Sequence, residues 1–238
     1  MKIAFISDIH GNAVALEAVL QDIEKQAVDK IVVLGDIAYR GPEPKKCLDI
    51  VRSLQTDVIK GNADEWLVRG VQQGEVPDSV LALMNEERDW GLTKLNKADI
   101  DYLQSLPHSL TLELEDVKTT IFHATPTSLF DIILPNTEDA IIEKELMTND
   151  AQLFVYGHIH LPYIRYINGK ILINTGSVGL PFDGIAKASY AIVEVQSGRI
   201  RTSLERVDYD KSRVLELYEQ EDYPNIEMMS RIIINGAR

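Results

Sequence analysis

KIAFISDIH (residues 2–10), KIVVLGD (residues 30–36) and DVIKGN (residues 57–62) are the three stretches that decide the fold class of this chain. Each contains a short run rich in Ile and Val, which predicts buried β-strands over residues 3–7, 30–35 and 57–60. A polar residue able to bind a cation follows each strand closely: Asp8, Asp36 and Asn62. The same arrangement of a buried strand followed by a polar ligand therefore occurs three times.

Two helices are predicted between these strands. Residues 12–26 carry apolar side chains at helical spacing with Asn12 as the cap, and residues 44–54 indicate a second helix after Gly41-Pro42 interrupts the chain. The resulting βαβαβ order predicts a parallel sheet with helices packed on it. The three polar residues would then lie at the carboxyl edge of the sheet, where open α/β sheets bind ligands.

Residues 63 to about 107 show no strand pattern and are rich in Glu, Asp, Leu and Trp. Their apolar spacing indicates three or four short helices, punctuated by Pro77 and Pro107. We interpret this segment as a helical insertion in a single domain of residues 1–238, placed to form a cap beside the functional site. A plain packing layer is the alternative.

Strand patterns return after Ser109. They cover residues 110–115, 118–122, 153–156, 170–174, 189–195 and 199–207. The last three are expected to be antiparallel strands, joined by turns such as Asn168-Gly169. Residues 137–147 and 211–220 indicate helices. Residues 226–234 also favour a helix, but the β-branched residues 232–234 leave a strand as an alternative.

The composition of the chain limits which partners and which cellular compartment are expected. Its 238 residues with 45% hydrophobic content fit one large domain, and its formal net charge of −13 disfavours long nucleic acid as a partner. The single Cys47 fits a reducing compartment. The first strand is too short for a signal-peptide core, and no apolar run approaches the ~20 residues of a membrane span. We expect a cytoplasmic protein with no membrane partner, and a homo-oligomer is compatible with the sequence.

Four of the five histidines stand in short patterns that, together with Gly35-Asp36 and Gly61-Asn62, indicate one site. The seven residues concerned are Asp8, His10, Asp36, Asn62, His123, His158 and His160. They offer carboxylate, imidazole and amide donors, which suit Mn, Fe or Zn. We interpret them as the catalytic and metal-binding residues of one two-metal phosphoesterase site. Asp36 is the candidate for a bridge that screens the repulsion between the two cations.

The ordered set of motifs resembles a known family, the calcineurin-like metallophosphoesterases. The similarity rests on Asp8-Ile9-His10, on Gly35-Asp36 within residues 35–42, on Gly61-Asn62, on His123 and on residues 157–160. It is greatest with the small prokaryotic phosphodiesterase branch, whose Asn-Pro-Gly-Ser stretch is similar to residues 174–177. The similarity covers residues 1–62 and roughly 118–207, and the fold it implies is a four-layer α/β/β/α sandwich.

The resemblance also implies how two divalent ions would share the ligands. One ion would take Asp8, His10, Asp36 and His160, and the other would take Asp36, Asn62, His123 and His158. The ions would lower the pKa of a bridging water toward ~7, and the resulting hydroxide would attack phosphorus in line. Two carboxylates, two divalent ions and neutral imidazoles leave a net charge near +2, which would draw a phosphate into an acidic protein.

Ala63 departs from the family pattern. Many members have a His directly after Gly-Asn, and that His is thought to protonate the leaving group; here the run is Gly61-Asn62-Ala63-Asp64. Because alanine cannot transfer a proton, the change favours substrates with acidic leaving groups. The expected substrates are small phosphodiesters, or nucleotides and dinucleoside polyphosphates.

Other candidate residues are assigned structural roles. His108 matches no motif and is interpreted as a surface or packing residue. Arg40 is near enough in sequence to reach a substrate phosphate, but we expect a solvated loop arginine. Trp66 and Trp90 are compatible with a base-stacking cleft, but their helical neighbours favour core packing.

The expected function is thus a dinuclear metal-dependent hydrolase of phosphoesters. The alternative is a non-catalytic scaffold on the same fold, as found in a trafficking-complex subunit, but a scaffold has no reason to keep all seven ligands. A P-loop nucleotidase is excluded because the chain lacks a Gly-x-x-x-x-Gly-Lys-Ser/Thr run.

Overall fold

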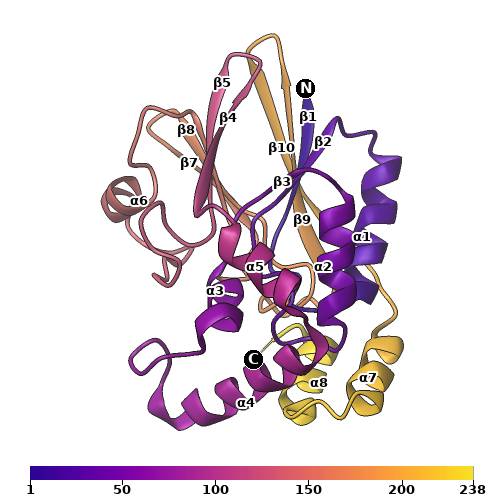
Figure 1. The fold of residues 1–238 in the computed structure, drawn as a ribbon. Coiled ribbons are helices and arrows are strands. Elements are labelled where there is room, and N and C mark those ends of the chain that lie inside the picture. The colour runs from indigo at the N-terminus through magenta and orange to yellow at the C-terminus, as the bar shows by residue number, and fades with distance from the viewer. Residues whose placement is uncertain (238) are drawn as a thin grey trace.

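The computed structural model describes residues 1–237 and confirms the four-layer arrangement, with two five-stranded sheets between layers of helices (Figure 1). The first sheet has the spatial order β10 (Arg199–Val207), β9 (Ala188–Gln196), β1 (Lys2–Ile6), β2 (Lys30–Val33) and β3 (Asp57–Val58). The second has the order β4 (Ser109–Leu114), β5 (Val117–Phe122), β6 (Leu153–Tyr156), β8 (Lys170–Asn174) and β7 (Tyr163–Ile167).

Each sheet has a parallel centre. The strands β1, β2 and β3 are parallel, as the βαβαβ pattern predicts, and β5, β6 and β8 are parallel in the second sheet. The prediction for residues 170–174 is therefore only half right, because β8 is antiparallel to β7 but parallel to β6. The partner in the hairpin is Tyr163–Ile167, which the sequence pattern did not single out as a strand.

Three apolar clusters fill the three spaces between the four layers. Strand alternation sends Ile3 and Phe5 of β1 into the cluster between the sheets, whereas Ala4 and Ile6 face the cluster beneath the helices. A third cluster lies between the outer face of the second sheet and α6 (Asp139–Glu145), and it includes Ile142. The parallel strands are thus buried on both faces, which is why their sequences are continuously apolar.

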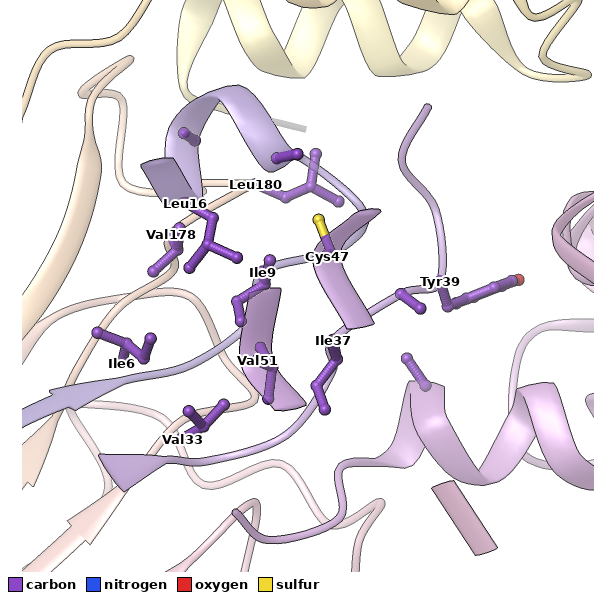
Figure 2. Close-up of a cluster of buried hydrophobic side chains, with 14 of the residues drawn as sticks. Ile6, Ile9, Leu16, Val33, Ile37, Tyr39, Cys47, Val51, Val178 and Leu180 are labelled. Carbon is purple, nitrogen blue, oxygen red and sulfur yellow. The ribbon is translucent and has the colours of Figure 1, made fainter. Parts of the chain in front are cut away.

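Two helices cover the outer face of the first sheet (Figure 1). They are α1 (Ala13–Lys25), whose N-cap Asn12 accepts a hydrogen bond from the Ala15 amide, and α2 (Pro44–Ser53). In Figure 2, Leu16 of α1 and Val51 of α2 point toward Ile6 and Val33 of the strands. This packing holds the carboxyl ends of β1 and β2 side by side.

The remaining helices gather at the end of the sandwich where the parallel strands terminate (Figure 1). They are α3 (Asn62–Arg69), α4 (Asp78–Lys94), α5 (Lys97–Ser105), α7 (Lys211–Gln220) and α8 (Ile226–Asn235). Residues 226–234 are helical, so the strand alternative is wrong: Met229, Ile232 and Ile233 are buried together on one helical face. Within residues 1–237, no helix combines the length and apolarity that crossing a bilayer requires.

Candidate active site

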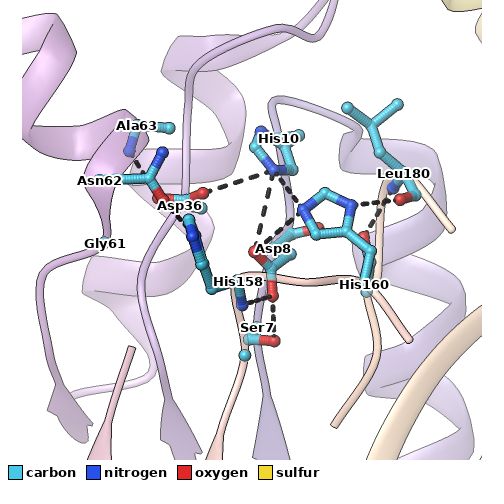
Figure 3. A network of polar contacts seen from close by, with 12 residues as sticks. Ser7, Asp8, His10, Asp36, Gly61, Asn62, Ala63, His158, His160 and Leu180 are labelled. Atoms are coloured by element: carbon cyan, nitrogen blue, oxygen red, sulfur yellow. Dashed lines mark hydrogen bonds and ion pairs between the residues drawn. The ribbon is translucent and has the colours of Figure 1, made fainter. Parts of the chain in front are cut away.

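All seven predicted ligands lie at the carboxyl ends of parallel strands. Asp8 and His10 follow β1, Asp36 follows β2, and Asn62 begins α3 shortly after β3. From the second sheet, His123 follows β5, and residues 158 and 160 follow β6. Because these ends meet at one edge of the sandwich, side chains 152 positions apart in the sequence become neighbours (Figure 3).

One group of four side chains encloses a space suited to a single ion. Ligand atoms of Asp8, His10, Asp36 and His160 all lie within 4.8 Å of one another, and all four residues are buried. Nε2 of His160 lies 3.2 Å from Oδ1 of Asp8 and 3.2 Å from Nε2 of His10. These are the four residues that the family resemblance assigns to one metal.

The other predicted ligands form a second group that adjoins the first. Oδ1 of Asn62 lies 2.9 Å from Nε2 of His123 and 2.8 Å from Nδ1 of His158. Oδ2 of Asp36 lies 3.4 Å from Nε2 of His123 and 3.5 Å from Nε2 of His10. Asp36 therefore stands between the two groups and lies close to a histidine of each.

Backbone carbonyls orient three of the four imidazoles. Nδ1 of His10 donates to the Tyr39 carbonyl (2.9 Å), and Nδ1 of His123 donates to the Leu34 carbonyl (2.7 Å). Nδ1 of His160 donates in the same way to the Leu180 carbonyl. In the neutral form of each ring this places the lone pair on Nε2, which faces the cluster, as metal-binding histidines require.

A second observation, besides the orientation of the imidazoles, indicates that these side chains can bind a metal. Oδ1 of Asp8 and Nε2 of His158 are buried and form no hydrogen bond with any described residue. Buried polar atoms are nearly always paired, so orphaned donor atoms in such a cluster are the arrangement expected of metal ligands. Divalent metal binding is thus supported by the residues themselves, with two carboxylates, four imidazoles and an amide available.

Charge in the cluster is arranged to hold cations. Burial by itself raises the pKa of Asp8 and of Asp36, but the adjacent imidazoles, His160 and His123 respectively, hold both pKa values below the usual range. Burial lowers the pKa of His10 and His158 to about 4, so both are neutral ligands at neutral pH. Burial also acts to lower the pKa of His123, but the Asp36 carboxylate outweighs it and raises that pKa to about 10. The site thus attracts positive charge.

Five of the seven residues adopt left-handed backbone conformations. Asp8, His10, Asp36, His158 and His160 have φ between 49° and 67°. Such conformations are uncommon outside glycine and are found at functional sites, where the surrounding structure enforces them. They turn the Asp-x-His and His-x-His stretches so that both side chains of each pair point into the cluster (Figure 3).

Two glycines permit the close approach of the loops. A Cβ atom on Gly35, whose φ is +87°, would lie 2.3 Å from the Gly61 nitrogen. A Cβ atom on Gly157 would lie 2.6 Å from Oδ2 of Asp8. Both positions therefore require a residue without a Cβ atom.

Asp64 supports the site in a way that the sequence analysis did not identify. Its buried carboxylate accepts hydrogen bonds from the backbone amides of Asp36 (2.8 Å), Ile37 (2.9 Å) and Gly61 (2.9 Å). Burial and the Asp36 charge raise its pKa to about 7. Asp64 thereby ties the loop after β2 to the start of α3. The available signal was its place two residues after Asn62, at the third position of a helix, where a capping carboxylate is common.

Further support comes from polar residues around Asp8 and β8. Oγ of Ser7 donates to Oδ2 of Asp8 (2.5 Å) and lies 2.6 Å from Oγ1 of Thr175. The Asn174 side chain donates to the Gly157 carbonyl at 2.6 Å. The stretch at residues 174–177 therefore holds the loops that carry Asp8 and His158 rather than entering the cluster itself.

The expectation that Arg40 is solvated is wrong. Only 14% of its side chain is exposed, and its Nε lies 3.2 Å from Oε2 of the fully buried Glu87 of α4. The reason is tertiary: α4 places a carboxylate against the loop after β2, and burying that charge requires a partner. His108 is exposed, as expected, and Trp90 packs against Tyr223.

Ala63 is fully buried beneath the site. Its amide donates to Oδ1 of Asp36 (2.7 Å), while its side chain belongs to the cluster between the first sheet and the helices. A histidine in its place would have to displace packed side chains before it could reach a substrate.

A cavity of about 400 Å³ opens on the cluster, and we call it the site pocket. His10, Asp36, Asn62, His158 and His160 form one wall, and Trp66 and residues of α4 face them. A larger groove of about 670 Å³ lies near the amino end of β2 and shares no residue with the cluster. The helical segment between β3 and β4 therefore contributes a wall of the site pocket, and Trp66, only 8% exposed, belongs both to that wall and to the core.

Known proteins resemble this chain in sequence and in fold. The calcineurin-like phosphoesterase superfamily domain matches residues 1–198. An uncharacterized protein of Methanocaldococcus jannaschii is 32% identical over 236 residues, covering 90% of each chain, and the phosphodiesterase YfcE of Escherichia coli is 27% identical over 198 residues, covering 82% of this chain and 88% of its own. The crystal structure of a metallophosphoesterase from Sphaerobacter thermophilus superimposes with a TM-score of 0.80 at 29% identity, covering 100% of this chain and 99% of that one.

The chain belongs to the calcineurin-like phosphoesterase superfamily, and it is accordingly a metal-dependent phosphoesterase.

Replacing Gly157 with alanine should weaken metal binding. The added Cβ would overlap Oδ2 of Asp8 and Oγ of Ser7, so Asp8 must move. Disturbing a residue that orients a ligand typically lowers metal affinity about 10- to 100-fold. The measurement is metal content after dialysis against a buffered Mn²⁺ series. Gly91→Ala in α4 is the matched control, since its Cβ would meet only Leu67 at an ordinary 3.4 Å. Equal metal content in the two variants would contradict the geometry described above.

Proposed function

We propose that this protein hydrolyses small phosphodiesters, or nucleotide and dinucleoside polyphosphates, with two divalent ions held by the seven residues of the cluster. Mn, Fe and Zn suit the mixed imidazole and oxygen donors. The observation that carries the proposal is the position of Asp36. Its Oδ2 lies within 3.5 Å of Nε2 of both His10 and His123, which belong to different ligand groups.

Each residue has a defined part in this proposal. Asp8, His10 and His160 would hold one ion, while Asn62, His123 and His158 would hold the other. Asp36 would contact both, and its carboxylate charge would reduce their mutual repulsion. Its orientation is already set, because Oδ1 accepts the Ala63 amide and thereby leaves Oδ2 for the cluster.

Bound divalent ions supply a nucleophile at neutral pH and neutralise charge on the phosphate. The protein supplies the place where this occurs. The cluster is buried, so a phosphate reaches it only through the site pocket. There His10, His158 and His160 form the wall next to the substrate. A phosphoester would enter with its phosphate against this wall and with one ester group toward the helices.

The surroundings offer little help to a poor leaving group. Ala63 is buried and has no proton to give. The pocket carboxylates Glu75 and Glu87 are both in ion pairs, with Arg69 and Arg40 respectively. The Arg69 partnership outweighs the effect of burial and holds the pKa of Glu75 below its usual value, so this group is ionised and cannot act as an acid at neutral pH. The proposal therefore favours substrates whose leaving groups are stable without protonation.

Removing metal tests the proposal directly. Prolonged chelation should abolish turnover of bis(4-nitrophenyl) phosphate, because the side chains of the cluster contain no other activated nucleophile. Adding Mn²⁺ or a similar ion should restore it. The measurement is the initial rate against independently determined metal content. Full turnover by a sample verified as metal-free would refute a metal-dependent mechanism.

Substituting Asp36 should show whether the cluster, rather than a histidine or an acid elsewhere in the chain, forms the active site. Asp36→Asn removes the charge that holds both ions, so metal content should fall and the rate should drop roughly 100-fold or more, since even residues that only orient a ligand cost 10- to 100-fold in metal affinity or activity. His108→Ala, at an exposed position away from the site, should keep both values. Metal analysis and kcat/KM on the same preparations give the comparison. Similar losses in the two variants would show that the site is elsewhere.

The rate should depend steeply on the pKa of the leaving group. General acid catalysis is typically worth ~10²–10⁴ in rate, and neither Ala63 nor the paired carboxylates of the pocket supply it. A series of aryl and alkyl phosphodiesters should therefore show kcat falling sharply as the leaving group becomes more basic. A nearly flat dependence, with chemistry shown to be rate-limiting, would mean that another residue donates the proton.

A further inference from the structure

Outside the cluster, most of the side chains that line the site pocket are apolar. Apolar side chains from five separate parts of the chain line the pocket: Trp66 of α3, Val80 and Leu83 of α4, Phe130 after β5, Phe182 after β8, and Met228 of α8. A cavity of about 400 Å³ with mostly apolar walls and a few convergent polar groups is typical of small-molecule sites. Its shape indicates that a substrate brings an apolar group alongside its phosphate.

Charged groups outside the cluster are already paired. The residues concerned are Arg40, Glu75 and Glu87. Oε2 of Glu87 lies 3.2 Å from Nε of Arg40, and its Oε1 accepts from Asn225 at 2.8 Å. Glu75 accepts from Arg69 (2.5 Å) and from the Trp66 indole (3.0 Å). No lysine lines the pocket within residues 1–237. A second or third phosphate would therefore meet two carboxylates and no unpaired cation, which disfavours polyphosphates.

Aromatic rings bring the apolar wall up to the cluster. The Phe182 ring stacks on the imidazole of His160, with centroids 4.2 Å apart and planes 9° from parallel. The rings of Trp66 and Phe130, which both line the pocket, contact each other with centroids 5.9 Å apart. A flat ring next to the phosphate would gain from burial and from contact with these aromatic side chains.

We propose that the site pocket binds an aromatic ester group of a phosphodiester that carries a single phosphate. This inference rests on the proposed function and decides between its two substrate classes, in favour of diesters over polyphosphates. The helices α3, α4 and α8 would then determine specificity, while the strand ends determine the chemistry. The ring can belong either to the leaving group or to the ester group that stays on the phosphate, because the proposal requires only that the ring bind in the pocket.

Binding of two phosphonates to the full chain loaded with Mn²⁺ tests the inference without turnover. Phenylphosphonate and methylphosphonate present the same head group to the metal site and differ only in the ring. Calorimetry should give a Kd for phenylphosphonate about tenfold lower or more, since a factor of ten needs only ~1.4 kcal/mol and burying an aromatic side chain exceeds that. Equal affinities would overturn the pocket assignment while leaving the proposed function intact. Failure to bind either compound, together with no turnover of any diester, would instead contradict the proposed function.

Two leucines on one helix provide a matched comparison. Leu83 lines the pocket, whereas Leu81 packs against the core cluster and does not line it. Leu83→Ala should reduce the preference for phenylphosphonate several-fold, and Leu81→Ala should leave the ratio of the two Kd values unchanged. If the ratio of the two Kd values changes equally in both leucine variants, or in neither, the inference is overturned.

Trp66 gives a second readout that does not depend on either leucine variant. The chain has two tryptophans, and Trp90→Phe leaves Trp66 as the only indole. Phenylphosphonate should change its emission, and methylphosphonate should change it much less. An unchanged emission at saturating phenylphosphonate would contradict binding of the ring beside Trp66.

Two further ligands identify the source of the ring and test the charge argument. Thymidine 5′-monophosphate binding as tightly as phenylphosphonate would identify a nucleobase, and weaker binding would identify a simple aryl group. A kcat/KM for ATP above that for thymidine 5′-(4-nitrophenyl phosphate) would overturn the preference for a single phosphate.

Discussion

Two buried carboxylates impose the constraint on which the rest of this structure depends. Asp8 is fully buried and Asp36 is 2% exposed. An ionised carboxylate out of water is costly unless it is paired and hydrogen-bonded. Apart from Ser7, which is adjacent to Asp8, the partners here come from distant segments: the His158 amide for Asp8, the Ala63 amide for Asp36, and imidazoles from both sheets. The sandwich is thus arranged so that strand ends deliver compensating groups to one place.

The packed core stabilises the energetically unfavourable backbone conformations of the site. Five predicted ligands have left-handed φ values, and such conformations cost of order 1–3 kcal/mol each. The loops that carry them are short and leave strands buried on both faces, so their ends have little freedom to relax. Asp64 adds a second restraint by accepting three amides from two of those loops. The site is therefore preorganised by the fold rather than by the metals alone.

In the proposed function, chemistry and specificity would come from different parts of the chain. The strand ends carry all seven predicted ligands, and they lie within the region that matches the superfamily, residues 1–198. One wall of the pocket comes from α3 and α4, and Asn225 and Met228 come from the C-terminal segment beyond that region. The ion pair between Arg40 and Glu87, extended by Asn225, joins these parts. His158, whose buried Nε2 has no hydrogen-bond partner among the described residues, lines this pocket, and an unpaired donor atom there is expected of a metal site rather than of a binding-only protein.

The sequence was enough to predict the parallel strands of the first sheet, the helices between them and the family, because these depend on local periodicity and on which residue types follow each strand. It also named the seven residues that the structure brings together. It did not determine the conformation of residues 226–234, because propensity there favours both helix and strand and only packing of Met229, Ile232 and Ile233 decides. It missed β7, the environment of Arg40 and the role of Asp64. The environment of Arg40 and the role of Asp64 depend on partners distant in sequence, Glu87 on α4 and the loop after β2, whereas β7 was missed although its partner β8 follows it directly in a hairpin. The pocket exists only where five segments of the chain meet, so its apolar character was decided by the tertiary structure.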